Sequence, residues 1–422
     1  MIYNESQYNL VIKENADYIY LYNTYSGAYV KLEKEVYATI IGRDIDAENP
    51  CQYFDELKKQ GIIKPKDLNE FNKLLLHERC VVYDSDQSSL TFVLVPTLAC
   101  NLKCVYCFED GLKSKPSMTE ETVIKTVRYV LSRITKKTKN VHFTWFGGEP
   151  LMAYDKIKFF YRLFKEDGKT SKLKVSSSII TNGVLLDKEK VKFLAEECDL
   201  VQAQITMDGT ETIYCKQKGA TKEQYLSVIK NIRDCSQYIK VSVRLNCNES
   251  NFDDLCAVSQ NILEICKINK NLSFYLAKLE DYGCGNGNCL SLSDFGIKNI
   301  QFQKYICTIT EKKYRADLPH CRKSFCGLFK LKNTVVGPEG ELYKCEHFVG
   351  RKDKIIGDIE NGYYYTDEMM NFLNNLPHEK CCKCKLFPLC LGGCPAQKQD
   401  LKLGYSCLVD EPYIKNLLFD YE

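Results

Sequence analysis

The sequence predicts an α/β protein, in which a partial (β/α)6 barrel follows a winged-helix-like domain and precedes a cysteine-rich domain. Three observations predict this order. Strand and helix patterns alternate six times over residues 89–310, and residues 1–88 show three strands before three helices. Residues 311–422 hold nine of the 23 cysteines. A length of 422 residues suits two or three domains at roughly 150 residues each.

Short apolar runs separated by turn signals predict the strands of the amino-terminal domain, with Ser26-Gly27 as one turn. The strands are expected at residues 8–13, 17–23 and 28–32. Helical spacing of apolar residues predicts helices at 33–41, 53–59 and 67–76. Three strands followed by three short helices is a winged-helix pattern.

Six strands, each followed by a helical stretch, predict the barrel. They are expected at residues 91–95, 141–145, 174–180, 200–206, 240–245 and 272–277. The clearest helix is expected over 120–134, with Ser117 and Glu120 spaced as a capping box. Strand–helix alternation favours a parallel sheet, here curled into a partial barrel. From about residue 320 the sequence becomes cysteine-dense, and we expect few strands there.

Composition narrows the class of protein. A formal net charge of +3 gives no reason to expect a nucleic-acid partner. The amino terminus, MIYNESQYNL, lacks a basic start and an apolar run, and no stretch is long enough to span a bilayer. We therefore expect a cytoplasmic protein without a membrane partner. In a reducing compartment, 23 cysteines favour metal binding over disulfides.

The first cysteine motif follows the first barrel strand. Cys100, Cys104 and Cys107 form C-x3-C-x2-C, which can hold three irons of a four-iron cluster and leave the fourth iron open. An open iron can bind a substrate or a cofactor. The competing interpretation is a structural zinc site, which needs four ligands, and no fourth cysteine or histidine lies close by.

With the aromatic Tyr106 before its third cysteine, this motif resembles that of radical S-adenosylmethionine (SAM) enzymes. The resemblance implies that the methionine part of SAM chelates the open iron. It also implies that one electron, from a donor such as flavodoxin or ferredoxin, breaks the sulfonium bond. The resulting 5′-deoxyadenosyl radical abstracts hydrogen from the substrate, and the protein orients the reactants and excludes water.

The strand ends carry further expected SAM contacts. Gly147-Gly148-Glu149-Pro150 resembles the family's GGEP segment, which meets the methionine amine; alone it would be an ordinary turn. The glycines would let the backbone approach the ligand, and the carboxylate would accept from the amine. Thr206 stands where the family often has serine, near the ribose or carboxylate. Arg244 is expected to pair with the methionine carboxylate, the alternative being a surface salt bridge.

The carboxyl-terminal cysteines resemble a SPASM domain, a cysteine-rich iron–sulfur domain, over about 90 residues. Cys326, Gly340 and Cys345 give C-x13-G-x4-C, and Cys381, Cys384, Cys390 and Cys394 give C-x2-C-x5-C-x3-C, with Cys382 left out as a spare thiol. The resemblance implies two auxiliary four-iron clusters, and thus three [4Fe-4S] clusters in all. Their implied ligands are Cys321, Cys326, Cys345 and Cys394 for one, and Cys381, Cys384, Cys390 and Cys407 for the other. Two closed zinc sites are the alternative.

For function, two maturase classes compete. One crosslinks ribosomally made precursor peptides, and the other oxidises a cysteine or serine of a sulfatase to formylglycine. The amino-terminal domain resembles a precursor-recognition element, which would bind a leader peptide at its sheet edge. We therefore expect a thioether crosslink from a precursor cysteine, with carbon–carbon crosslinking as an alternative. A third hypothesis is a colourless, zinc-stabilised peptide-binding protein.

Overall fold

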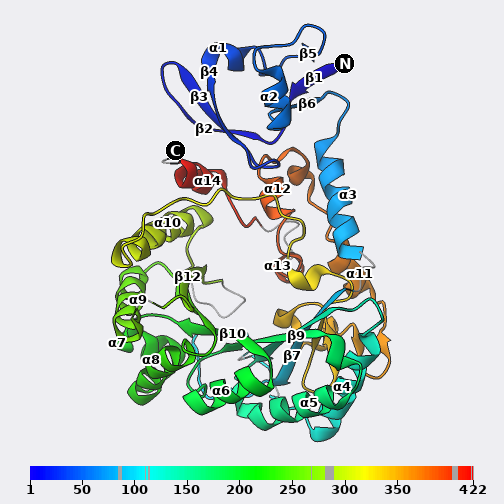
Figure 1. Ribbon diagram of the computed structural model, residues 1–422, viewed down its shortest axis with the longest axis vertical. Helices are drawn as coiled ribbons and strands as arrows, with labels where there is room; N and C mark the ends of the chain where they lie inside the picture. Colours follow the sequence, from blue (N-terminus) through cyan, green and yellow to red (C-terminus); the bar gives the residue numbers. More distant parts are fainter. Residues whose placement is uncertain are drawn as a thin grey trace.

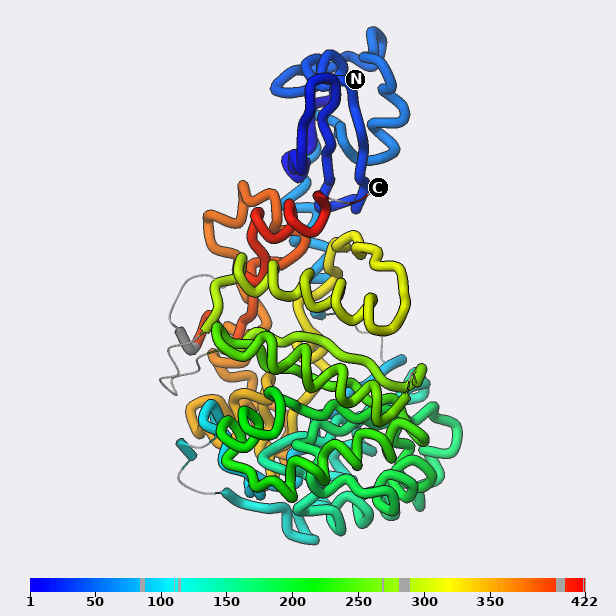
Figure 2. Tube along the Cα trace, turned by 90° about the vertical axis from the view of Figure 1, so that its left-hand side faces the viewer, coloured from blue at the N-terminus to red at the C-terminus, as the bar shows by residue number. Residues whose placement is uncertain are grey.

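The computed structural model describes residues 1–83, 88–109, 111–112, 115–267, 269–280, 289–401, 407–419 and 421. Figures 1 and 2 show the amino-terminal domain as a lobe at one end and the large sheet with its helices at the other. Both chain termini lie at the amino-terminal-domain end (Figure 1). Among the helices described, none is long and apolar enough to cross a membrane.

The amino-terminal domain contains the three predicted strands and three helices. The strands β2 (Asn9–Glu14), β3 (Tyr18–Asn23) and β4 (Tyr29–Glu33) form an antiparallel sheet. A second small sheet was not expected; it joins β5 (Ile45–Asp46), β1 (Ile2–Glu5) and β6 (Ile63–Pro65). The helices are α1 (Lys34–Ala38), α2 (Phe54–Lys59) and α3 (Glu70–Tyr83). These elements share a core that includes Leu21, Val36 and Leu57.

The six predicted barrel strands are all present and parallel. In spatial order they are β12, β11, β10, β9, β8 and β7. Their bounds are β7 (Ser89–Thr97), β8 (Asn140–Gly147), β9 (Lys174–Thr181), β10 (Leu200–Met207), β11 (Lys240–Cys247) and β12 (Leu272–Lys278). Because all six run in one direction, their carboxyl ends meet at one edge of the sheet.

In the described residues after 320 the strands are few and short, as expected. Four short strands continue the sheet beyond β7: β13 (Thr334–Val336), β14 (Glu341–Tyr343), β15 (Gly357–Asp358) and β16 (Gly362–Tyr363). Strand β13 pairs parallel to β7, with Thr334 opposite Phe92. Strands of two or three residues are too short to show a period of two, so sequence periodicity could not detect them.

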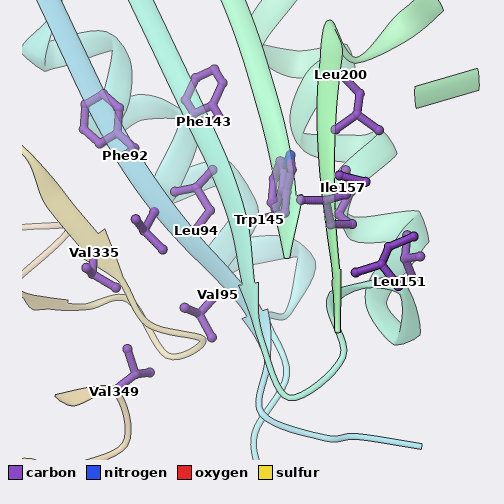
Figure 3. Packing of buried hydrophobic residues seen from close by; sticks show 14 of the residues in the cluster. Phe92, Leu94, Val95, Phe143, Trp145, Leu151, Ile157, Leu200, Val335 and Val349 are labelled. Carbon is purple, nitrogen blue, oxygen red and sulfur yellow. The ribbon is translucent and has the colours of Figure 1, made fainter. Parts of the chain in front are cut away.

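Helices cover the outer face of the sheet (Figure 1). They are α4 (Glu120–Arg133), α5 (Tyr154–Glu166), α6 (Lys188–Glu197), α7 (Glu211–Lys218), α8 (Lys222–Cys235), α9 (Phe252–Cys266) and α10 (Leu292–Ile309). Figure 3 shows Trp145 of β8 beside Ile157 of α5. The Phe143 ring also meets Phe164 edge-on, with 5.1 Å between centroids. Alternate residues of each strand are thus buried against the helices, and the residues between them face the barrel interior.

One predicted cap was wrong. The hydroxyl of Thr119, not that of Ser117, caps α4 by accepting from the Thr122 amide at 3.0 Å. Ser117 instead lies in a bridge to Thr97, and the two hydroxyl oxygens are 2.6 Å apart. The chain is therefore still extended at Ser117, because this residue pairs with Thr97 at the end of β7. Helix α4 begins three residues later.

The amino-terminal domain packs firmly on the carboxyl-terminal region. This region supplies α11 (Asp367–Asn374), α12 (Phe387–Cys390), α13 (Pro395–Leu401) and α14 (Glu411–Leu418). Helix α14 packs on β2, and the Phe71 ring of α3 lies 4.8 Å from Phe387. The hydroxyls of Tyr22 and Thr24 donate to the carbonyls of Pro319 and Lys385. Figure 1 shows α12 and α14 next to β2.

Candidate active site

The first cysteine motif lies on the loop that follows β7, and backbone hydrogen bonds fix this loop to the end of α7. The Lys103 amide donates to the Lys218 carbonyl at 3.0 Å, and the Val105 amide to the Gln217 carbonyl at 2.9 Å. Within the loop, the Cys107 amide donates to the Cys104 carbonyl at 3.1 Å. The loop is therefore held at the carboxyl ends of the strands, where barrel enzymes place their chemistry.

The three thiols of this loop are partly buried and close enough to affect one another. Burial raises the pKa of Cys107 to about 11, and Glu109, Cys104 and Cys100 add to that rise. The Cys100 sulfur accepts from the Leu102 amide at 3.5 Å. Among the described residues, no three His, Cys, Asp or Glu side chains are close enough to share one metal ion. In a four-iron cluster each of three thiolates would bind a different iron.

The two glycines of the GGEP segment allow a close approach between two parts of the backbone. Gly147 has a φ of +127°, and a Cβ there would lie 2.3 Å from the Thr97 carbonyl oxygen. A Cβ on Gly148 would lie 2.4 Å from the carbonyl oxygen of Ala99. The glycines thus allow the backbone of β8 to approach the start of the cysteine loop. They position that loop, whatever contact they also make with a ligand.

The Glu149 carboxylate is held inside the protein by several hydrogen bonds. It is fully buried, and it accepts from the amides of Leu151 and Asn182 and from the Thr181 hydroxyl at 2.9–3.0 Å. Burial raises its pKa to about 7, while these hydrogen bonds oppose the rise. Pro150 begins the short 3-10 turn that follows (Pro150–Ala153). Glu149 therefore ties the end of β8 to the end of β9.

Thr206 and Arg244 face each other in register on adjacent strands. Thr206 of β10 pairs with Arg244 of β11, and both side chains are partly exposed on the inner side of the sheet. The Arg244 Nε donates to Asn246 Oδ1 at 3.0 Å, and Asn246 Nδ2 donates to the Tyr106 hydroxyl at 3.2 Å. Arg244 therefore belongs to a network that reaches the cysteine loop.

Sequence reasoning missed the buried group that supports Tyr106. The Tyr106 hydroxyl donates to Asp208 Oδ2, and the Lys218 Nζ lies 3.5 Å from that same oxygen. Asp208 Oδ1 is buried without a hydrogen-bond partner in the described part of the chain. Burial raises the pKa of the Cys104 thiol, and the Lys218 charge partly offsets this. Nothing in the sequence distinguishes Lys218 from the many exposed lysines.

The inner face of the sheet is lined with polar side chains. His142 of β8 lies 2.9 and 3.0 Å from the hydroxyls of Ser176 and Ser178 on β9. Further along, the Tyr275 hydroxyl of β12 donates to Gln204 Oε1 of β10 at 2.6 Å. A polar interior with an unpartnered carboxylate oxygen at its rim fits a polar ligand such as SAM.

The carboxyl-terminal cysteines gather in two groups. Burial is the main cause of the raised pKa of Cys326 and of Cys345, and Cys394 adds to the rise at both. A second group brings together Cys381, Cys384, Cys390 and Cys407. Cys321 packs against the same hydrophobic cluster as Cys381 and Cys384. Cys382, next to Cys381 in the sequence, is exposed.

Comparison with known proteins identifies the domain. Residues 94–247 match the radical SAM superfamily. The chain is 28% identical over 355 residues to the cysteine-type anaerobic sulfatase-maturating enzyme of Clostridium perfringens, covering 73% of this chain and 90% of that protein. It is 21% identical to the radical SAM cyclopropyl synthase TigE of Paramaledivibacter caminithermalis, covering 92% of this chain and 89% of that one.

The fold is shared with a solved structure. Streptococcus suis SuiB bound to precursor peptide SuiA has a TM-score of 0.54 and 15% identity, covering 93% of this chain and 95% of that one. The family match spans β7 to β11 and includes the cysteine loop, the GGEP segment, Thr206 and Arg244. The chain therefore has a radical SAM domain and is a radical SAM superfamily enzyme, homologous to peptide- and protein-modifying maturases.

Proposed function

We propose that this enzyme installs a crosslink, namely a cysteine thioether, in a ribosomally made precursor peptide. The observation that carries the proposal is a groove beside a free strand edge on the amino-terminal domain. The comparisons with TigE and SuiB extend over 92% and 93% of this chain, against 73% for the sulfatase-maturating relative. SuiB was solved with a precursor peptide, which supports a peptide substrate.

The leader peptide would bind along β4. In the described residues β4 pairs only with β3, whereas the other edge strand, β2, packs on α14. A groove of about 330 Å³ lies between β4 and α2. Its lining is mixed apolar and charged: Val30, Lys31, Leu32, Glu33, Tyr53, Glu56, Leu57 and Gln60. An extended leader could add a strand to the free edge and place alternate side chains in the groove.

The cofactors follow from the cysteine groups. Cys100, Cys104 and Cys107 would hold the cluster that binds SAM, and Tyr106, the GGEP segment, Thr206 and Arg244 would surround SAM. The two carboxyl-terminal groups would hold two auxiliary [4Fe-4S] clusters. Cys321 is proposed as the fourth ligand of the first auxiliary group, because the second already has four cysteines. When bound, SAM and its cluster supply a 5′-deoxyadenosyl radical after reduction by a flavodoxin or ferredoxin.

The reaction balances as an oxidation of the peptide. Thioether formation breaks one S–H and one C–H bond and forms one C–S bond. The hydrogen atom of the C–H bond would be accepted by the radical that bound SAM supplies, and a proton would go to solvent. An auxiliary cluster held by the carboxyl-terminal cysteines would accept the remaining electron. The polar inner face, including the Tyr275–Gln204 and His142–Ser176 pairs, is the surface available to orient this part of the peptide.

Replacing Tyr53 by alanine is expected to weaken leader binding by about tenfold, equivalent to about 1.4 kcal/mol. Tyr53 lines the groove and is 49% exposed, and exposed tyrosines contribute strongly to peptide interfaces. The measurement is fluorescence anisotropy with a labelled leader of the precursor encoded beside the gene. Ile41→Ala is the matched control, because Ile41 is also 49% exposed on this domain but lies outside the groove. Equal affinities for the two variants would place the leader elsewhere.

Sulfatase maturation is the second candidate, and the Clostridium perfringens relative favours it. Mass spectrometry of the reacted peptide separates the two. A thioether or carbon–carbon crosslink removes two hydrogens and keeps every sulfur. Formylglycine formed from cysteine removes sulfur and two hydrogens and gains oxygen. We expect loss of two hydrogens from the precursor peptide and no change in a sulfatase-derived peptide; the reverse result would establish the second candidate.

A further inference from the structure

Tyr8 of the amino-terminal domain reaches into the auxiliary cysteine region. It lies in the turn between β1 and β2 and is fully buried. Its ring packs in one cluster with Leu74 of α3 and with Phe387 and Leu391 at α12. Cys321, Cys381 and Cys384 pack against that same cluster. The side chain therefore crosses from one domain to the proposed cluster ligands of another.

The Tyr8 hydroxyl has no hydrogen-bond partner among the described residues. The neighbouring Gln7 side chain does not reach hydrogen-bonding geometry with this hydroxyl. Buried hydroxyls rarely go without a partner, so this donor needs an acceptor. The sulfurs of Cys321 and Cys384 pack against the same cluster and can accept.

A second tyrosine of the amino-terminal domain, Tyr22, also contacts the segment that leads into Cys321. It is also fully buried, and its hydroxyl donates to the Pro319 carbonyl, two residues before Cys321. Cys321 adds to the burial-driven rise in the pKa of Tyr22. Two tyrosines of the amino-terminal domain therefore flank Cys321, but only Tyr8 has a hydroxyl without a partner.

We propose that the Tyr8 hydroxyl donates a hydrogen bond to a cluster-bound cysteine sulfur, Cys384 or Cys321, and so makes the amino-terminal domain part of an auxiliary-cluster site. This rests on the auxiliary clusters of the proposed function. Tyr8 acts as a positioning residue that does not touch the substrate. A hydrogen bond to a cluster sulfur stabilises the reduced, more negative state, so it raises the reduction potential.

Tyr8→Phe in the full-length, cluster-loaded enzyme tests the proposal. The variant keeps the ring and its packing, and removes only the hydroxyl. Redox titration followed by electron paramagnetic resonance is expected to show a lower midpoint potential for one auxiliary cluster, with wild-type iron content. Tyr25→Phe is the control, because the Tyr25 ring lies 6.0 Å from that of Tyr8 on the same domain.

The outcomes separate this proposal from the one on which it rests. Unchanged potentials in Tyr8→Phe, with full iron content, would overturn the hydrogen bond and leave the auxiliary clusters standing. An equal shift in Tyr25→Phe would also overturn it, since the effect would then be general to the domain interface. If the wild-type protein contains only the iron that the first cysteine loop can hold, the proposal of auxiliary clusters is itself wrong.

Discussion

Cys104→Ala is expected to abolish SAM cleavage, with 5′-deoxyadenosine production falling to background, while the auxiliary iron stays in place. Cys104 is the central ligand of a loop that offers three thiolates, and two thiolates cannot hold three irons of the cluster. The loop lies apart from the two carboxyl-terminal cysteine groups in the sequence. Iron in anaerobically purified protein should therefore fall from about twelve to about eight per chain.

Cys382→Ala is the control for this experiment. Cys382 is an exposed thiol next to Cys381 and belongs to neither proposed ligand set, so its removal should change neither iron content nor 5′-deoxyadenosine. Wild-type 5′-deoxyadenosine production in Cys104→Ala would contradict the assignment of the loop. Stoichiometric zinc with little iron in the wild-type protein would instead favour a zinc-stabilised protein.

Lys218→Met should destabilise the fold by about 3–5 kcal/mol, because it leaves a buried carboxylate without its cation. The side chains of Lys218 and Asp208 are 4% and 2% exposed, and Nζ lies 3.5 Å from Oδ2. Methionine fills similar space but leaves Asp208 only the hydroxyl of Tyr106. Anaerobic thermal unfolding would measure the loss. The cation also favours the ionised form of Cys104, so the variant should retain less iron in the first cluster.

Two further variants make the interpretation specific. Lys222→Met removes a lysine that is 63% exposed and pairs with Glu211 at 3.3 Å, and exposed pairs contribute only about 0–1 kcal/mol. The double variant Asp208→Asn/Lys218→Met removes both charges and should recover much of the lost stability, because replacing both partners spares the unpaired charge. A double variant as unstable as Lys218→Met would show that packing, not charge, explains the loss.

Periodicity predicted the elements that are long enough to show it. The six parallel strands and α4 repeat their apolar residues several times, and each was located within a few residues. The spacing of Cys326, Cys345 and Cys394 likewise predicted a grouping that the fold produces. The apolar periodicity is local, and the cysteine spacing is a set of fixed intervals. Both can therefore be recognised in a single sequence.

Contacts that depend on tertiary structure could not be predicted in this way. The sequence motif marked Gly148 and Glu149, but it could not show that they also fasten β8 to the cysteine loop and to β9. Lys218 looks like an ordinary surface lysine in the sequence, yet the fold buries it beside Asp208, where its charge affects Cys104. Cys321 is close in sequence to Cys326, yet it packs against the same cluster as Tyr8 and Cys384.

The pairing of β13 with β7 affects how this chain can be made and divided. About 240 residues separate the two strands, so the hydrogen-bonding edge of β7 stays open until the chain has been synthesised almost to its end. A fragment that stops near residue 310 would expose this edge, on the strand that leads into the cysteine loop, to pairing with other chains. The barrel strands therefore cannot be transferred on their own. A chimera between related maturases should exchange residues 89–336 as one segment.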